Sequence, residues 1–210
     1  MILKVLIACE ESQTVMKAFR DMGHEAFSCD IQECSGGYPE FHLQMDAIEA
    51  LKIKKWDLMI GHPPCTYLCT AGFHYSLKRP ERMELTIQAH DFFMALMGSD
   101  IEYIALENPV GIMSTRFRKP DQIIEPFQFG HPERKKTCLW LKNLPVLEHT
   151  SNLEVKPLKT IIRKSGRLMG KPYNYYWRQG KSAKERSVTF QGIAEAMASQ
   201  WSEYIIKSKV

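Results

Sequence analysis

The sequence predicts an α/β fold in which a mostly parallel sheet has helices on both faces. Short apolar runs of strand length alternate with helical patterns over the first two thirds of the 210 residues. The helical segments are long enough to form the right-handed crossovers that connect parallel strands. Ligands in such sheets bind at the carboxyl ends of the strands, so a functional site is expected there.

The first strand is predicted over residues 4–9, and the second, over residues 26–29, ends at Asp30. Between them, Ser12 is the expected N-cap of a helix. The apolar stripe of that helix stops at Gly23 and consists of Val15, Met16, Phe19 and Met22.

Three further strands and a long helix follow. The strands are predicted over residues 41–45, 56–60 and 101–106, and the helix over residues 80–97. Side chains that can bind or react come at or just after four of the strand ends, namely Asp30, Asp46, Cys65 and Glu107. Because the carboxyl ends of parallel strands share one edge of a sheet, this coincidence is the first functional signal. Beyond it the pattern weakens, and the remaining predictions are short strands over 127–129 and 137–141 and a closing helix over 193–206.

Composition favours a globular protein inside the cell. Hydrophobic residues make up 44% of the chain and charged residues 25%. No apolar run reaches the ~18–20 residues of a membrane span and no signal peptide is recognised, so we expect a cytoplasmic protein without membrane contact. The six cysteines are then expected to be reduced, and none of their spacings is that of a zinc site, so no metal is expected.

Positive charge is concentrated in one segment. Ten basic residues and one acidic residue lie between Lys156 and Arg186, so this segment carries +9 and the rest of the chain −5. Such a segment is typical of proteins that bind a polyanion such as a nucleic acid. The alternative is a solvated loop without a partner, and charge alone does not choose between the two.

Pro63-Pro64-Cys65 follows the strand over residues 56–60. Two prolines restrict the backbone, so Cys65 would stand on a rigid turn, as a nucleophile requires. We expect nearby N–H groups to lower its pKa toward that of a reactive thiolate. The alternative role is that of a small buried apolar side chain.

Glu107 and Asn108 follow the strand over residues 101–106, at the same predicted sheet edge as Cys65. Beside a cysteine and an apolar wall, the pKa of Glu107 is expected to rise, so that this group can donate a hydrogen bond as an acid. Asn108 has the alternative, structural role of capping the next turn.

The turn after the first strand contains no glycine and reads Cys9, Glu10, Glu11, Ser12, Gln13. It therefore lacks the G-x-G-x-x-G pattern of dinucleotide-binding turns, and its two acids would repel a pyrophosphate. A cofactor with a cationic or zwitterionic end suits this turn better. Asp30 either accepts hydrogen bonds from ribose hydroxyls or only ends its strand.

Two of these motifs resemble those of the cytosine-C5 DNA methyltransferase family. Residues 57–65 (DLMIGHPPC), followed by Ala71-Gly72, are similar to its Pro-Cys motif, and residues 105–111 (ALENPVG) to its Glu-Asn-Val motif. Weaker similarity covers three further segments, over residues 19–30, 129–135 and 192–201. The resemblance implies a Rossmann-like S-adenosylmethionine-dependent methyltransferase fold.

The cofactor implied by this resemblance is S-adenosylmethionine, which agrees with the argument against a pyrophosphate. Asp30 would hold the ribose, Asp46 the adenine amino group, and Glu10 or Glu11 the methionine ammonium group. The full set expected around the cofactor is Cys9, Glu10, Glu11, Ser12, Gln13, Asp30, Ile31, Asp46, His62 and Pro63.

The resemblance also implies the catalytic groups. Cys65 would attack C6 of cytosine and Glu107 would bond N3 and the 4-amino group, while Lys135 stands near the place of a family arginine. Because a base inside a duplex is out of reach, the target would be flipped out or single-stranded. The residues expected to contact the nucleic acid are Pro64, Asn108, Arg134, Lys136, Arg163, Lys164, Arg167, Lys171 and Arg178.

The chain departs from the family mainly in size. The family inserts a large target-recognition domain before its last motif, whereas here only the basic, aromatic segment over residues 142–187 stands between a core over residues 1–141 and a closing helix over residues 188–210. Cations can neutralise phosphates and aromatic rings can stack on bases, so this segment would replace the missing domain. We expect a phage-type enzyme with short sequence recognition, acting as a monomer or weak dimer.

Two alternatives stay open. The same C5 chemistry can act on a free cytidine nucleotide or on RNA, with a modified cofactor if the altered first turn accepts one. A catalytically inactive relative that binds nucleic acid is the other alternative, and the presence of both Cys65 and Glu107 speaks against it.

Overall fold

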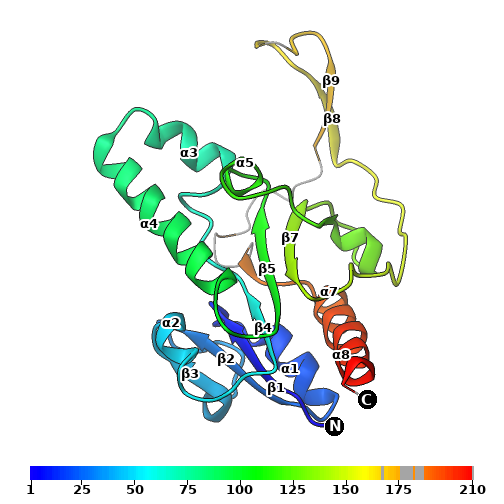
Figure 1. Cartoon of the computed structure of the whole chain (residues 1–210). Helices are drawn as coiled ribbons and strands as arrows, with labels where there is room; N and C mark the ends of the chain where they lie inside the picture. Colours follow the sequence, from blue (N-terminus) through cyan, green and yellow to red (C-terminus); the bar gives the residue numbers. More distant parts are fainter. Residues whose placement is uncertain (167, 176–181, 183–186, 210) are drawn as a thin grey trace.

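A seven-stranded sheet with the order β3-β2-β1-β4-β5-β7-β6 forms the centre of the part of the chain that the computed structural model describes, residues 1–166, 168–175, 182 and 187–209 (Figure 1). Five strands run parallel: β1 (Lys4–Ala8), β2 (Glu25–Asp30), β3 (His42–Gln44), β4 (Leu58–Gly61) and β5 (Tyr103–Pro109). The antiparallel edge consists of β7 (Thr137–Lys142) and β6 (Gln122–Ile124). Strand order reverses between β1 and β4, which is where sheets of this kind bind ligands.

Helices cover both faces of the sheet, as the alternation of side chains along β1 requires. Val5 and Ile7 pack with the apolar side chains of α1 (Thr14–Asp21), α7 (Gln191–Ala196) and α8 (Ser202–Ser208). Leu6 and Ala8 point to the opposite face and pack with those of α2 (Ala47–Ala50) and α4 (Pro80–Met97). The α/β prediction with helices on both faces is therefore confirmed. Short elements complete the core: the 3₁₀ turns Pro39–Phe41 and Pro126–Phe129, α3 (Thr70–Ser76) and α5 (Met113–Arg116).

The start of α1 differs from the sequence prediction. Ser12 is not its N-cap: Gln13 precedes the helix in the left-handed region, with φ 60°, and makes no side-chain cap. Instead, the Glu10 carboxylate reaches from the preceding turn and accepts hydrogen bonds from the backbone N–H groups of Val15 (2.7 Å) and Met16 (3.1 Å). Met22 was also placed wrongly in the apolar stripe, because it lies beyond the helix and is 48% exposed.

The segment before β7 also differs from the sequence prediction. Residues 127–129 form a 3₁₀ turn and not a strand, because Pro126 stands at its first position and Glu125 and Gln128 form a capping box. Gly130 ends the turn with φ 85°, a conformation that suits glycine. The strand of this region is β6, five residues earlier, whose short apolar run is too weak a pattern to predict.

The basic segment forms a hairpin apart from the main sheet. β8 (Lys159–Ile162) and β9 (Pro172–Tyr175) pair antiparallel in a two-stranded sheet, which projects from the body of the molecule in Figure 1. The closing helix returns to the core, as predicted, but it includes a π turn (Met197–Trp201) between α7 and α8. Within the described residues, none of the helices is long and apolar enough to cross a membrane.

Candidate active site

A cavity of about 440 Å³ opens at the carboxyl ends of β1, β2, β4 and β5. This is the edge at which the sequence placed the functional residues, and its volume lies within the range of small-ligand sites. The residues that line it are Cys9, Glu10, Glu11, Ser12, Asp30, Gln32, His62, Pro63, Pro64, Cys65, Glu107, Asn108, Pro109, Lys135, Ser187, Val188 and Thr189.

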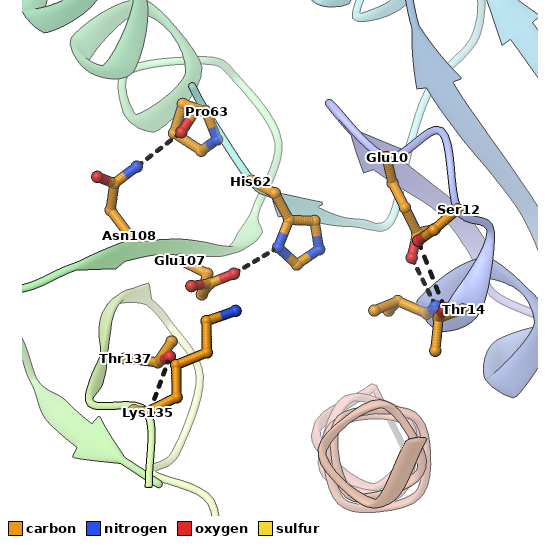
Figure 2. Close-up of polar contacts among 10 residues, drawn as sticks. Glu10, Ser12, Thr14, His62, Pro63, Glu107, Asn108, Lys135 and Thr137 are labelled. Atoms are coloured by element: carbon orange, nitrogen blue, oxygen red, sulfur yellow. Dashed lines mark hydrogen bonds and ion pairs between the residues drawn. The ribbon is translucent and has the colours of Figure 1, made fainter. Parts of the chain in front are cut away.

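His62 and Glu107 form a pair at the centre of this edge (Figure 2). Gly61 of β4 is in register with Leu106 of β5, so the residues that follow them stand side by side. The Nδ1 atom of His62 and Oε2 of Glu107 are 2.9 Å apart. Both side chains are largely buried, with 11% and 14% of their surface exposed.

The opposite charges of His62 and Glu107 shift the pKa values of both groups, which was not expected from the sequence. Burial by itself would raise the pKa of Glu107, but the hydrogen bond and charge of His62, together with the charge of Lys135, hold this pKa below its usual value. Burial likewise opposes a charged His62, yet the carboxylates of Glu107 and Glu10 raise its pKa. The expectation of a raised pKa for Glu107 is therefore wrong for the free protein, because the opposing charge outweighs desolvation.

Cys65 lies on the turn after Pro63 and Pro64 and lines the same cavity as Glu107. Its pKa is raised by burial and by the neighbouring Cys69 and Glu107, so the expected lowering of the thiol pKa is also wrong. A backbone hydrogen bond of Cys65 and the charge of Lys135 act in the opposite direction and lower this pKa, but burial outweighs them. The free protein therefore holds Cys65 as a thiol, and a thiolate requires a change in the cavity.

Asn108 ties the cysteine loop to β5. It is buried, and its Nδ2 donates to the backbone carbonyl of Pro63 at 2.7 Å (Figure 2). The alternative of a cap on the following turn is therefore wrong, because the amide acts between two strands. Its Oδ1 has no partner among the described residues, and Asn108 lines the cavity.

Acidic side chains line the part of the cavity next to β1 and β2. Glu10 is buried and caps α1, and burial raises its pKa. The Glu11 carboxylate accepts a hydrogen bond from the Ser35 hydroxyl. Asp30 Oδ1 accepts from the backbone N–H of Gln32 at 2.9 Å. Three carboxyl groups, two from the first turn and one from the end of β2, thus line this part of the cavity.

Three residues expected around a cofactor lie outside this cavity lining. Gln13 is fully buried and bonds the backbone of Tyr38 through both ends of its amide, which is a structural role. Ile31 is 72% exposed. Asp46 is the N-cap of α2, where its Oδ1 accepts from the Ile48 N–H at 2.7 Å. Cys9, Ser12 and Pro63 do line the cavity.

The basic residues predicted as functional lie in two places, beside the cavity and on the hairpin. Lys135 lines the cavity, whereas its neighbour Arg134 forms an ion pair with Glu125 at 3.1 Å and Lys136 is exposed. On the hairpin, the guanidinium group of Arg163 lies over the Tyr173 ring, and Lys164 and Lys171 are exposed. Arg167 and Arg178 fall outside the described residues.

Several lining residues were not expected from the sequence. Gln32, Val188 and Thr189 lie in loops, which carry no periodic pattern that would indicate them, Ser187 directly precedes the last two, and Pro109 is the last residue of β5. In the described ranges, no group of three or more His, Cys, Asp or Glu side chains is arranged to hold a metal ion.

No model of a known protein family matches this sequence, and no curated protein matches it. Among proteins of known structure, 73 chains match. One is the Entamoeba histolytica methyltransferase EhMeth, with a TM-score of 0.51 and 11% identity over 100% of this chain and 99% of that one. The chain has the Rossmann-like S-adenosylmethionine-dependent methyltransferase fold. Another of the matching chains is a prophage-encoded E. coli protein described as a DNA modification methyltransferase, with a TM-score of 0.48 and 14% identity over 100% of this chain and 69% of that one.

Proposed function

We propose that this chain transfers a methyl group from S-adenosylmethionine to C5 of cytosine in DNA, through a covalent bond between Cys65 and C6 of the base. The observation that carries the proposal is that Cys65 and Glu107, from two neighbouring strands, line one cavity together with the acids that follow β1 and β2. A thiol nucleophile, a carboxyl group for the base and an acidic cofactor side thus share one site.

The residues of the cavity fit a zwitterionic cofactor. Its acidic side, with Glu11 and Asp30, suits an ammonium group and ribose hydroxyls, and the buried Nε2 of His62 is a polar atom without a partner among the described residues. When bound, S-adenosylmethionine supplies an electrophilic methyl group. Because Asp46 caps α2 outside the cavity lining, we do not assign the adenine contact to it.

On the substrate side, the Cys65 thiol first passes its proton to the carboxylate of Glu107, which lines the same cavity, and its sulfur then bonds C6 of the cytosine. The electron pair of the C5–C6 double bond becomes available at C5, with negative charge spread to N3. Glu107 stabilises this charge when it carries a proton toward N3 and accepts from the 4-amino group. After methylation, the C5 proton is lost to solvent, its electron pair restores the C5–C6 double bond, and the sulfur of Cys65 leaves as a thiolate.

The charge of the hairpin favours a nucleic-acid polymer over a free nucleotide as the substrate. The hairpin cations Lys164 and Lys171 are exposed and can contact phosphates, and Tyr173 is partly exposed for contact with a base. We propose that residues 142–187 act as the reduced target-recognition segment and that the target cytosine enters the cavity flipped out or from a single strand.

The decisive experiment identifies the methylated nucleoside. The protein is incubated with methyl-labelled S-adenosylmethionine and with duplex DNA, single-stranded DNA, RNA or dCTP, and the product is digested and separated. Label on 5-methyldeoxycytidine supports the proposal, whereas label confined to adenine or guanine contradicts it. Label on RNA or dCTP alone selects the alternative substrates.

A second cysteine, Cys69, provides a matched control for testing Cys65 as the nucleophile. DNA that contains 5-fluorocytosine should trap a covalent complex with the wild type and with Cys69→Ser, because Cys69 lies outside the cavity lining. The complex should be absent with Cys65→Ser. A complex that survives Cys65→Ser would rule out this cysteine as the nucleophile.

A further inference from the structure

His62 stands between the two halves of the cavity. Its ring lies between Glu107, on the substrate side, and Glu10, on the side of the first turn (Figure 2). The Nδ1 atom is engaged by Glu107 at 2.9 Å. The proposed chemistry assigns no task to the opposite ring atom, Nε2.

Nε2 of His62 is a buried polar atom that has no hydrogen-bond partner within the described ranges of the chain. Glu10 forms no hydrogen bond with this atom, and its two carboxylate oxygens are turned to the N-terminus of α1, whose N–H groups they bind at 2.7 and 3.1 Å. A buried donor without an acceptor is costly, so an acceptor supplied by a ligand would be favourable there.

The charges around the ring define which acceptor fits. Glu107 and Glu10 favour a charged imidazole, and Lys135 opposes it, with the carboxylates prevailing. A charged imidazole donates from both nitrogens, so the buried Nε2 carries an N–H that points toward the side of the first turn, where Glu10 and Ser12 line the cavity (Figure 2). The best partner for such a donor is an anionic oxygen.

We infer that His62 binds the amino-acid carboxylate of the adenosylmethionine cofactor through Nε2–H while Nδ1–H holds the carboxylate of Glu107. This rests on the proposed function. The cofactor's ammonium group then faces the acids Glu11 and Asp30, and its carboxylate faces the imidazole. His62 is thus a cofactor-binding residue that also positions Glu107, so the cofactor fixes the orientation of the group that receives the base.

The test measures binding of S-adenosylhomocysteine, which carries the amino-acid carboxylate, and of 5′-methylthioadenosine, which lacks the amino-acid end. Titration calorimetry is performed with the wild type and with His62→Gln. Loss of one charge-assisted hydrogen bond predicts that His62→Gln weakens S-adenosylhomocysteine by about 10- to 100-fold. The affinity for 5′-methylthioadenosine is expected to be unchanged, which also shows that the variant is folded.

Lys135→Gln is the matched control, because it removes another cation from the same cavity lining. It is expected to leave the ratio of the two affinities unchanged. A selective loss in Lys135→Gln and not in His62→Gln would overturn the inference, as would equal losses for both ligands in His62→Gln. If the wild type binds neither ligand, the proposed cofactor itself is wrong and both proposals fail.

A second variant tests the role of charge. Glu107→Gln keeps a hydrogen-bond partner for Nδ1 but removes the negative charge, so the pKa of His62 should fall. Its affinity for S-adenosylhomocysteine should then decline at a lower pH than in the wild type and recover on acidification. Identical pH profiles for the two proteins would contradict the inference.

Discussion

Glu10 offers a sharp test of how the first turn is built. Its side chain is buried and accepts hydrogen bonds from the N–H groups of Val15 and Met16, both of which are also buried. Glu10→Ala leaves these two donors of α1 without their acceptor. A lost helix cap and buried unpaired donors together predict a loss of about 2–4 kcal/mol in the free energy of unfolding.

Urea denaturation followed by circular dichroism measures this loss, and for a chain of this size the melting temperature should fall by roughly 5–15 °C. Glu33→Gln is the control, because Glu33 is exposed, and it should change the free energy of unfolding by less than about 0.5 kcal/mol. If Glu10→Ala unfolds at the same urea concentration as the wild type, Glu10 does not cap α1 in solution.

Three further outcomes are expected. The pair of His62 and Glu107 should stabilise the protein most at pH values between the lowered pKa of Glu107 and the raised pKa of His62. This stabilisation is lost as pH falls through the pKa of Glu107, and also as pH rises through the pKa of His62. The free energy of unfolding, measured against pH, should show this window in the wild type and lack it in Glu107→Gln. Lys164→Gln should weaken binding to duplex DNA and reduce the slope of log affinity against log salt by about one, and an unchanged slope would argue against a phosphate contact. Gly192→Ala should lower the melting temperature, because a Cβ there would collide with the backbone carbonyl of Phe129, and normal stability would contradict this close approach.

Local pattern was sufficient for most of the fold. The residues of α4 were predicted at both ends, because Pro80 starts the helix and Gly98 follows it. The strands β1, β2, β4 and β5 were found from apolar runs, since buried parallel strands are apolar on both faces. The failures lie where one tertiary contact decides the local structure, as with the capping of α1 by Glu10 and not by Ser12.

In the candidate site, too, most residues were predicted from local pattern, and the failure lies where the tertiary structure decides. Cys65, Glu107, Asp30 and the acids of the first turn were predicted because each follows a strand, and parallel strands end at one edge of the sheet. Asp46 follows a strand as well, but β3 lies at the edge of the sheet and Asp46 caps α2 outside the cavity lining. The position of a strand in the sequence does not reveal whether it lies at the centre or at the edge of the sheet.

The sequence by itself determined the α/β class, the rigid Pro-Pro-Cys turn and the set of groups that end at one sheet edge, because these depend on residue type and on periodicity along the chain. The tertiary structure alone decided the protonation of those groups. The register of β4 and β5 places His62 2.9 Å from Glu107, and this contact reverses the expected direction of the pKa of Glu107. A pKa depends on burial and on charges a few ångströms away, and both are set by residues far apart in the chain.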